Sequence, residues 1–260
     1  MANGTFERHE VKYLLDSRQR SALERAMLGH MQADEYGEST ICSLYYDTPD
    51  YRLIRRSLDK PDYKEKLRLR SYGRTKPEGK VFVELKKKYN GVVYKRRISM
   101  TEREAMASLA GKAPMPADCQ IGREIDWFLK FYKTLAPAMV LCYDRIAYFC
   151  PEDDGLRITF DRNIRWRDSD LDLRKGSQGR RILDEGMVLM EVKIKNALSL
   201  EMAKLFSGLN IYSASFSKYG EAYRQKFLDE QRGKRQREEM RQFLHNEEMY
   251  NGMHHSLVSA

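Results

Sequence analysis

The sequence predicts an α+β protein in which an antiparallel eight-stranded β-barrel encloses a charged lumen and helices pack on the outside. Two observations lead to this fold. Many strand-like segments alternate charged with apolar side chains at period two, which places each kind on its own face of a sheet. Several amphipathic helical segments also need an apolar surface to cover, and the apolar strand faces are the extensive one. We therefore expect the charged faces to line the interior.

The strongest alternation begins at Tyr63, in YKEKLRLRSYG. One face of this strand carries Lys64, Lys66, Arg68 and Arg70. The next segments, VFVELKKKY and VVYKRRI, flank Asn90-Gly91, a dipeptide that favours a tight hairpin because both residues tolerate positive φ. Their charged face carries Glu84, Lys86, Lys88, Lys95 and Arg97.

The elements before this hairpin follow the same logic. Residues 5–15 form a predicted strand with Arg8, Glu10 and Lys12 on one face. Asp16 or Ser17 can cap a helix that runs to about residue 31. A strand over residues 40–46 and a short helix over 51–57 complete the N-terminal part.

After the hairpin, a capping box at Thr101 opens a helix to about residue 110, and a second helix spans 122–134. Strands are predicted over 138–149 and 156–161, and residues 162–185 are predicted to be a polar surface excursion or a flap over a site. A strand over 187–195 and a helix over 199–209 follow. These last strands contribute Arg145, Arg157, Asp161, Glu191 and Lys193 to the charged faces.

Two segments make up the predicted domain organisation. Residues 1–228 form the folded domain, and residues 229–260 form a charged C-terminal helix or tail. No stretch reaches the roughly 20 apolar residues that span a bilayer, and the N-terminus lacks an apolar signal region. We therefore expect a cytoplasmic protein.

The charge balance predicts a polyanionic partner. The chain has a formal net charge of +9 and a pI of about 9.2. Single-stranded nucleic acid is disfavoured, because binders of that class set aromatic side chains among the cations, whereas here most aromatics share the apolar faces. Enclosed cations repel one another unless a counter-charge is present, and a chain of phosphates supplies one. The few carboxylates on these faces suit Mg²⁺ or Mn²⁺.

Motifs in a fixed order carry a family resemblance. They are RHEVKYLL, SLYYDTPDY, KLRLRSYG, VFVELKKKYNGVVYKRR, YDRIAY, LRITFD, MEVKIK and FSKYG, from about Phe6 to Phe227. The set resembles the polyphosphate polymerase domain of the vacuolar transporter chaperone (VTC) family, within the CYTH-like triphosphate tunnel metalloenzymes. The resemblance implies a tunnel in which the γ-phosphoryl group of ATP is transferred to growing inorganic polyphosphate with Mn²⁺ or Mg²⁺.

Position by position, the resemblance assigns phosphate binding to Lys12, Arg68, Arg70, Lys86, Lys95, Arg145, Arg157 and Lys218. Of these, the predicted catalytic set is Lys12, Arg68, Arg70, Lys86, Arg145 and Arg157. The charged strand faces add Lys66, Arg97 and Lys193 to the phosphate-binding set. Glu191 is the principal predicted metal ligand, supported by Glu10 and Asp161.

The chain departs from the ExExK pattern of the superfamily's hydrolases, because Arg8 stands in place of the first glutamate. This change favours a polymerase over a two-metal triphosphatase. The sequence lacks the membrane helices of the eukaryotic polymerases, so a separate membrane protein is a candidate partner. Two alternatives stay open: a metal-dependent triphosphatase that uses water as the acceptor, and a non-catalytic sensor of polyphosphate.

Overall fold

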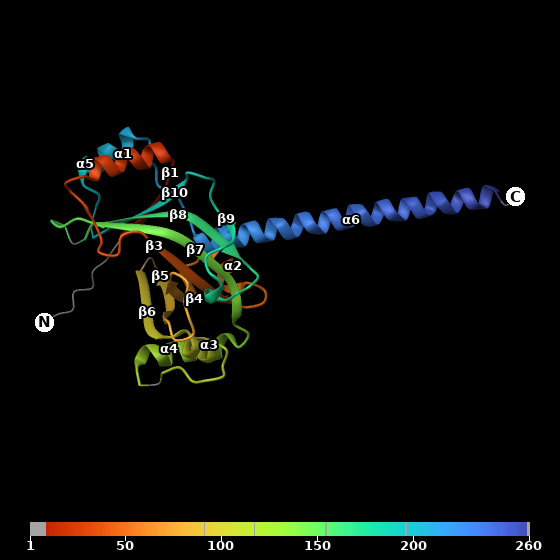
Figure 1. Cartoon of the computed structure of the whole chain (residues 1–260), viewed down its shortest axis with the longest axis horizontal. Coiled ribbons are helices and arrows are strands. Elements are labelled where there is room, and N and C mark those ends of the chain that lie inside the picture. The colour runs from red at the N-terminus through yellow and green to blue at the C-terminus, as the bar shows by residue number, and fades with distance from the viewer. Residues whose placement is uncertain (1–8, 91, 117, 154, 196, 259–260) are drawn as a thin grey trace. The chain divides into compact units, whose positions relative to one another are not determined.

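The computed structural model describes residues 9–258 except 91, 117, 154 and 196, with side chains up to residue 241 (Figure 1). Arg8 and Gly91, which the sequence analysis singled out, lie outside the described residues. The chain divides into two compact units, Met1–Gly220 and Glu221–Ala260. The boundary expected after residue 228 stays a prediction.

Ten strands of the described chain form one antiparallel sheet. Eight of them are hydrogen-bonded in the order β1-β10-β8-β7-β3-β4-β5-β6, while β2 pairs with β7 and β9 pairs with β8. The bounds are β1 His9–Leu15, β2 Gln32–Ala33, β3 Ser39–Asp47, β4 Tyr63–Tyr72, β5 Lys80–Tyr89, β6 Val92–Thr101, β7 Ala136–Phe149, β8 Arg157–Arg167, β9 Arg180–Arg181 and β10 Val188–Ile194. The α+β class and the eight main strands are confirmed.

Full closure of the barrel is not observed. In the described chain β1 and β6 are the ends of the strand path and are not paired with each other. The sheet is nevertheless curled, because Lys12 of β1 and Lys66 of β4 reach two neighbouring residues, Phe216 and Ser217. A chain segment also links β1 to β4. We call residues Ser213–Tyr219 the strap: Ala214 N–H donates to Lys12 O at 2.7 Å, and Lys66 Nζ donates to Ser217 Oγ at 3.2 Å.

Helices cover the outward, apolar face of the sheet in two groups, one at each end (Figure 1). Helices α1 (Ser17–Met27) and α5 (Leu200–Gly208) cover β1, β8 and β10. Helices α2 (Arg52–Leu58), α3 (Glu102–Leu109) and α4 (Gln120–Tyr132) cover β3, β4, β5 and β7. The apolar strand faces therefore point outward beneath helices, as predicted.

Local signals set the helix starts. Asp16 caps α1 through the backbone N–H groups of Arg18 and Gln19, and Thr101 forms the predicted capping box with Glu104. Asn90 adopts φ 45°, the left-handed conformation that the hairpin turn between β5 and β6 requires.

The predicted end of the strand at residue 161 is wrong, because β8 continues to Arg167. Asn163 takes φ 48° and the register with β7 shifts between Cys142 and Asp144, so the strand passes through a bulge and does not end. Burial of Ile164 and Trp166 holds the continuation in the sheet. The polar excursion is therefore shorter, and it contains a 3₁₀ turn (Leu173–Lys175) and β9.

The inward face of the sheet is apolar at one end. Leu14, Ile41 and Leu189 meet there with Tyr143 and Phe216. Along each strand this end lies beyond the charged positions: Leu14 follows Lys12 on β1, and Leu189 precedes Glu191 on β10.

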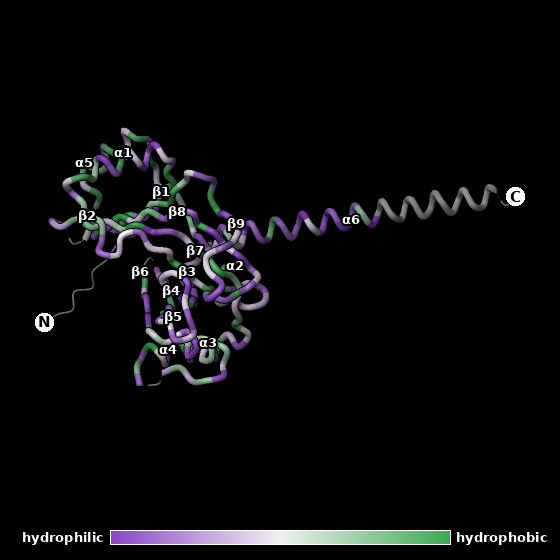
Figure 2. Tube along the Cα trace, viewed as in Figure 1, coloured by the Kyte–Doolittle hydropathy of each residue, from purple (hydrophilic) through white to green (hydrophobic). Residues whose placement is uncertain are grey.

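Helix α6 (Lys218–Val258) makes up most of the second unit. Its described side chains are mostly polar (Figure 2), with ion pairs one turn apart at Lys226–Glu230 and Arg235–Glu239. Over the residues described, no helix is long and apolar enough to cross a membrane.

Candidate functional site

The first charged group on the inward face is centred on Glu84 of β5, whose side chain is 1% exposed. We call it the Glu84 cluster. Its carboxylate pairs with Arg68 Nη2 at 2.7 Å, Arg70 Nε at 3.8 Å, Lys95 Nζ at 2.9 Å and Arg97 Nη2 at 2.7 Å. Burial alone would raise the pKa of Glu84, but Arg68 and Arg70 hold it well below its ordinary value. This carboxylate is therefore the counter-ion that lets the cations crowd together.

The second group is centred on Asp161 of β8 and Glu191 of β10, and we call it the Glu191 cluster. Arg145 binds both carboxylates, with Nη2 at 2.7 Å from Asp161 Oδ2 and 3.1 Å from Glu191 Oε2. Lys218 Nζ also bridges them, pairing with Asp161 and lying 3.0 Å from Glu191 Oε1. Lys12 Nζ is 3.7 Å from the same oxygen. Despite burial, Lys218 and Arg145 lower the pKa of Glu191 well below its ordinary value.

Two tyrosines join the clusters. Tyr45 OH accepts a hydrogen bond from Arg68 Nη1 at 3.0 Å, and Tyr143 OH accepts one from Arg70 Nη2 at 3.2 Å. The Tyr143 ring also lies under Lys218, with Nζ 4.6 Å from the centroid. Burial would raise the pKa of Tyr45, but Arg68 and Arg70 hold it below its ordinary value. The cations of the two clusters thus share neighbours and form one continuous site.

Sequence reasoning missed both tyrosines, because aromatic side chains were assigned mostly to the outward faces. A signal was present: Tyr143 is two positions from Arg145, so the two side chains share a face of β7. Asp47 and Tyr219 were also missed, although both belong to quoted motifs.

Lysines without a carboxylate partner among the described residues occupy the end of the inward face opposite the apolar end. In the β4–β5 register Lys66 is directly opposite Lys86, and Lys64 is directly opposite Lys88. Like charges in such cross-strand positions are destabilising. Burial, together with Lys12 and Lys86, lowers the pKa of Lys66 to about 7. The ammonium groups of these lysines therefore repel one another, and a bound anion would reduce that repulsion.

A stability measurement can check this repulsion. The folded pKa of Lys66 lies below its ordinary 10.5, so its charge destabilises the fold fully below pH 7 and this effect disappears as the pH rises toward 10.5. We expect Lys66→Met to raise the free energy of unfolding at pH 6.5, and to raise it less at pH 9.5, in urea titrations. The exposed Lys112→Met is the control. An equal gain at both pH values would contradict the assignment.

Some predicted residues lie apart from the two clusters. Arg157 Nη2 pairs with Asp34 at 3.1 Å and is half exposed. Lys86 is exposed, and Lys193 Nζ is 4.0 Å from Glu10. Glu10 borders the Glu191 cluster, because it pairs with Lys12 at 3.5 Å as well as with Lys193, but no contact joins it to Asp161 in the described structure.

The predicted metal ligands fit a divalent ion only in part. Within the described chain, no group of three or more His, Cys, Asp or Glu side chains is arranged to hold a metal. Asp161 and Glu191, which Lys218 bridges, offer two carboxylates on one face. Mg²⁺ commonly binds one or two carboxylates and completes its shell with water and substrate phosphates, so this pair suits such an ion.

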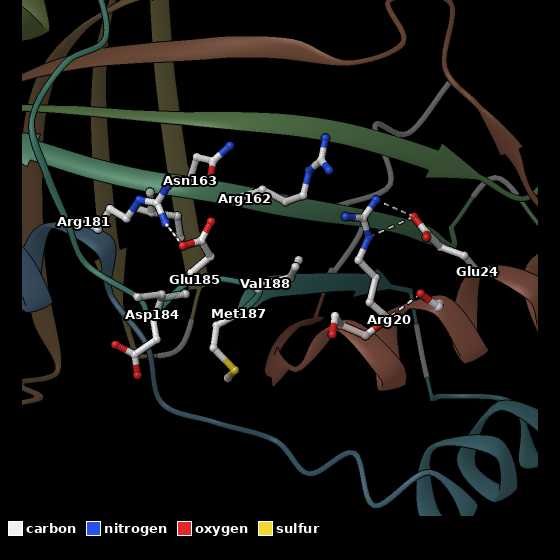
Figure 3. Close-up of a pocket in the computed structure, with 14 residues that line it drawn as sticks. Arg20, Glu24, Arg162, Asn163, Arg181, Asp184, Glu185, Met187 and Val188 are labelled. Atoms are coloured by element: carbon white, nitrogen blue, oxygen red, sulfur yellow. Dashed lines mark hydrogen bonds and ion pairs between the residues drawn. The ribbon is translucent and has the colours of Figure 1, made fainter.

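A separate pocket of about 470 Å³ lies between α1 and the segment that precedes β10 (Figure 3). Its arginines are matched by carboxylates: Arg20 binds Glu24, Arg181 pairs with Glu185 at 3.6 Å, and Arg162 binds Glu38. The cross-strand lysine pairs of β4 and β5 lack such partners in the described structure, which makes the inward face the stronger candidate for a polyanion.

Sequence comparison agrees with the resemblance noted above. The model of the VTC domain matches residues 7–227. The chain belongs to the VTC domain family. No curated protein matches it. The quoted motifs of this VTC domain supply most of the two clusters, including Arg68, Arg70, Arg145 and Glu191. The family and the cationic face together support a function in handling triphosphate or polyphosphate.

Solved structures with similar folds share little sequence with this VTC domain. A putative adenylate cyclase from Vibrio parahaemolyticus is 13% identical, with a TM-score of 0.47, covering 83% of this chain and 97% of its own. One from Bacillus halodurans is 14% identical, with a TM-score of 0.47 and coverage of 80% and 92%. A putative adenylyl cyclase from Hippeastrum, described as having a dominant triphosphatase activity, is 15% identical, with a TM-score of 0.48 and coverage of 81% and 92%.

Proposed function

We propose that this protein is an ATP-dependent polyphosphate polymerase that transfers the γ-phosphoryl group of ATP to the end of an inorganic polyphosphate chain. The observation that carries the proposal is the arrangement of charge along β4 and β5. Arginines balanced by Glu84 lie next to cross-strand lysine pairs that lack a carboxylate among the described residues. The family resemblance implies the same reaction.

Phosphoryl transfer needs alignment of the reactants and neutralisation of charge on the phosphate oxygens, and it needs little covalent chemistry from the protein. Arg68, Arg70 and Arg145 present guanidinium groups that can bind phosphate oxygens in pairs. Lys218 and Lys12 add point charges beside Glu191. The acceptor is already largely deprotonated near neutral pH, so no side chain has to act as a general base.

Asp161 and Glu191 are the residues that would hold a divalent ion. When bound there, the ion would neutralise charge on the phosphate oxygens. The protein's own part is to hold both carboxylates in place, which Arg145 and Lys218 do by each contacting both of them.

The lysine end of the inward face suits the polymer. Lys64, Lys66 and Lys88 continue the cationic face beyond Arg68 along β4 and β5. A polyphosphate chain has a negative charge on every unit, so it can neutralise successive lysines as it extends. We expect binding to weaken as salt increases, because these contacts are electrostatic.

Incubation with ATP and Mn²⁺ tests the proposal. We expect long phosphate polymers on a urea gel, with ADP as the second product. Formation of ADP and orthophosphate alone would replace the polymerase with a triphosphatase. Tight binding of tripolyphosphate without any nucleotide turnover would replace it with a sensor.

A further inference from the structure

Asp47 and Tyr219, from the quoted motifs YYDTPD and SKYG, have no role in the reaction described above, yet they meet in the structure. Tyr219 OH donates a hydrogen bond to Asp47 Oδ2 at 2.9 Å, and both residues are almost completely buried. Asp47 also accepts the backbone N–H groups of Leu53 and Ile54, at 2.9 and 3.1 Å. The end of β3 and the start of α2 thus form a fixed anchor for Tyr219.

Tyr219 connects this anchor to both charged clusters. Its ring stacks on Tyr45, with centroids 4.4 Å apart and an interplanar angle of 19°. Tyr45 OH in turn accepts the hydrogen bond from Arg68 of the Glu84 cluster. On the other side, Tyr219 directly follows Lys218, which bridges the two carboxylates of the Glu191 cluster.

The strap is held at its other end by β1. Ala214 N–H donates to Lys12 O, and Lys12 Nζ donates to Phe216 O at 3.0 Å. Ser217 Oγ accepts from Lys66 of β4. The next residue, Gly220, packs closely against α2, since a Cβ atom at this position would lie 2.9 Å from Leu58 Cδ2. The strap is therefore hydrogen-bonded on both sides of Lys218, to β1 before it and to Asp47 after it.

We infer that Asp47 and Tyr219 are positioning residues, whose hydrogen bond holds Lys218 and Tyr45, and through Tyr45 also Arg68, so that both clusters face one bound triphosphate. This inference rests on the proposed function, because it requires that the inward face binds phosphates. Neither residue touches the phosphates. They act by fixing side chains that do: Lys218 on the strap, and Tyr45, which lies directly opposite Arg68 in the β3–β4 register.

The test is a double-mutant cycle of Tyr219→Phe with Lys218→Ala, read as tripolyphosphate affinity by calorimetry without metal. Tyr219→Phe removes one hydroxyl and keeps the stacked ring. We expect it to raise the Kd by up to about fivefold, which is reached if the whole worth of the lost hydrogen bond is expressed in binding. Because phenylalanine keeps the stacking on Tyr45, the substitution acts mainly through Lys218, so it should add less than twofold when Lys218→Ala is already present. Tyr212→Phe, which removes an exposed hydroxyl bonded to Asn210, is the matched control and should leave the Kd unchanged.

Outcomes separate this inference from the proposed function. If tripolyphosphate binds the wild type and Lys218→Ala weakens it, but Tyr219→Phe only lowers the melting temperature, the tyrosine is merely structural and the inference fails alone. Fully additive effects of the two substitutions would also overturn it. If the wild type does not bind tripolyphosphate, both proposals fall. Asp47→Asn, which keeps an oxygen acceptor for Tyr219, should retain affinity closer to the wild type than Asp47→Ala does.

Discussion

Replacing Glu84 with glutamine should destabilise the protein by about 3 kcal/mol, because the substitution removes the shared carboxylate from the cations of its cluster. The effect should lie at the lower end for a broken buried ion pair, since Lys95 and Arg97 keep partial contact with solvent. Urea denaturation at pH 7 measures it. The same variant should bind tripolyphosphate more tightly, because the arginines then lack their internal counter-charge.

Glu78→Gln is the matched control. Glu78 pairs with Arg103 on the surface, and its side chain is 67% exposed, so its removal should change stability by less than about 1 kcal/mol. Saturating tripolyphosphate should restore more stability to Glu84→Gln than to the wild type, since a ligand stabilises the state that it binds. Equal stability of the two glutamine variants would show that the cluster does not depend on Glu84.

Replacing Glu191 with glutamine should lower turnover at least about a hundredfold, because it removes one of the two carboxylates that suit the divalent ion. The substitution also removes a negative charge beside Lys218, Arg145 and Lys12. Tripolyphosphate should therefore bind at least as tightly as before when no metal is present. Loss of turnover with retained binding separates a role for Glu191 in chemistry from a role in holding substrate.

Lys234→Ala on α6 is the control for this experiment, and we expect it to keep nearly full activity. Lys234 is exposed in the second unit. Similar losses in Glu191→Gln and Lys234→Ala would discredit the assignment of the site to the inward face. Weaker metal-free binding of tripolyphosphate by Glu191→Gln would assign Glu191 to the support of neighbouring cations.

The charged face could be predicted because its cause is local. Alternation at period two decides which side of a strand Arg68 and Glu84 occupy, whatever the rest of the chain does. The capping box at Thr101 and the turn at Asn90 are equally local. These local signals, taken together along the chain, therefore predict the eight main strands and the helices that cover their apolar side.

Other features depend on contacts between residues far apart in the chain. Nothing near Tyr219 in the sequence indicates that its hydroxyl meets Asp47, 172 residues away. The strap depends in the same way on contacts between distant residues, with Lys12 of β1 and with Lys66 of β4. Whether the two end strands pair to close the barrel is likewise decided by such contacts, so the alternating pattern cannot predict it. At Asn163 a bulge imitates the end of a strand, which explains the misplaced boundary of β8.

The two ends of the inward face differ in what they offer to a bound anion. Leu14, Ile41 and Leu189 offer nothing to an ionised oxygen, whereas the opposite end finishes in the pair of Lys64 and Lys88. If the inward face binds polyphosphate as proposed, the growing polymer should extend past these lysines and not across the apolar end, where it would lose its ionic contacts. Each new phosphate unit would then be added to the polymer end that lies at the two charged clusters, and the older units would move along the lysine end of the inward face.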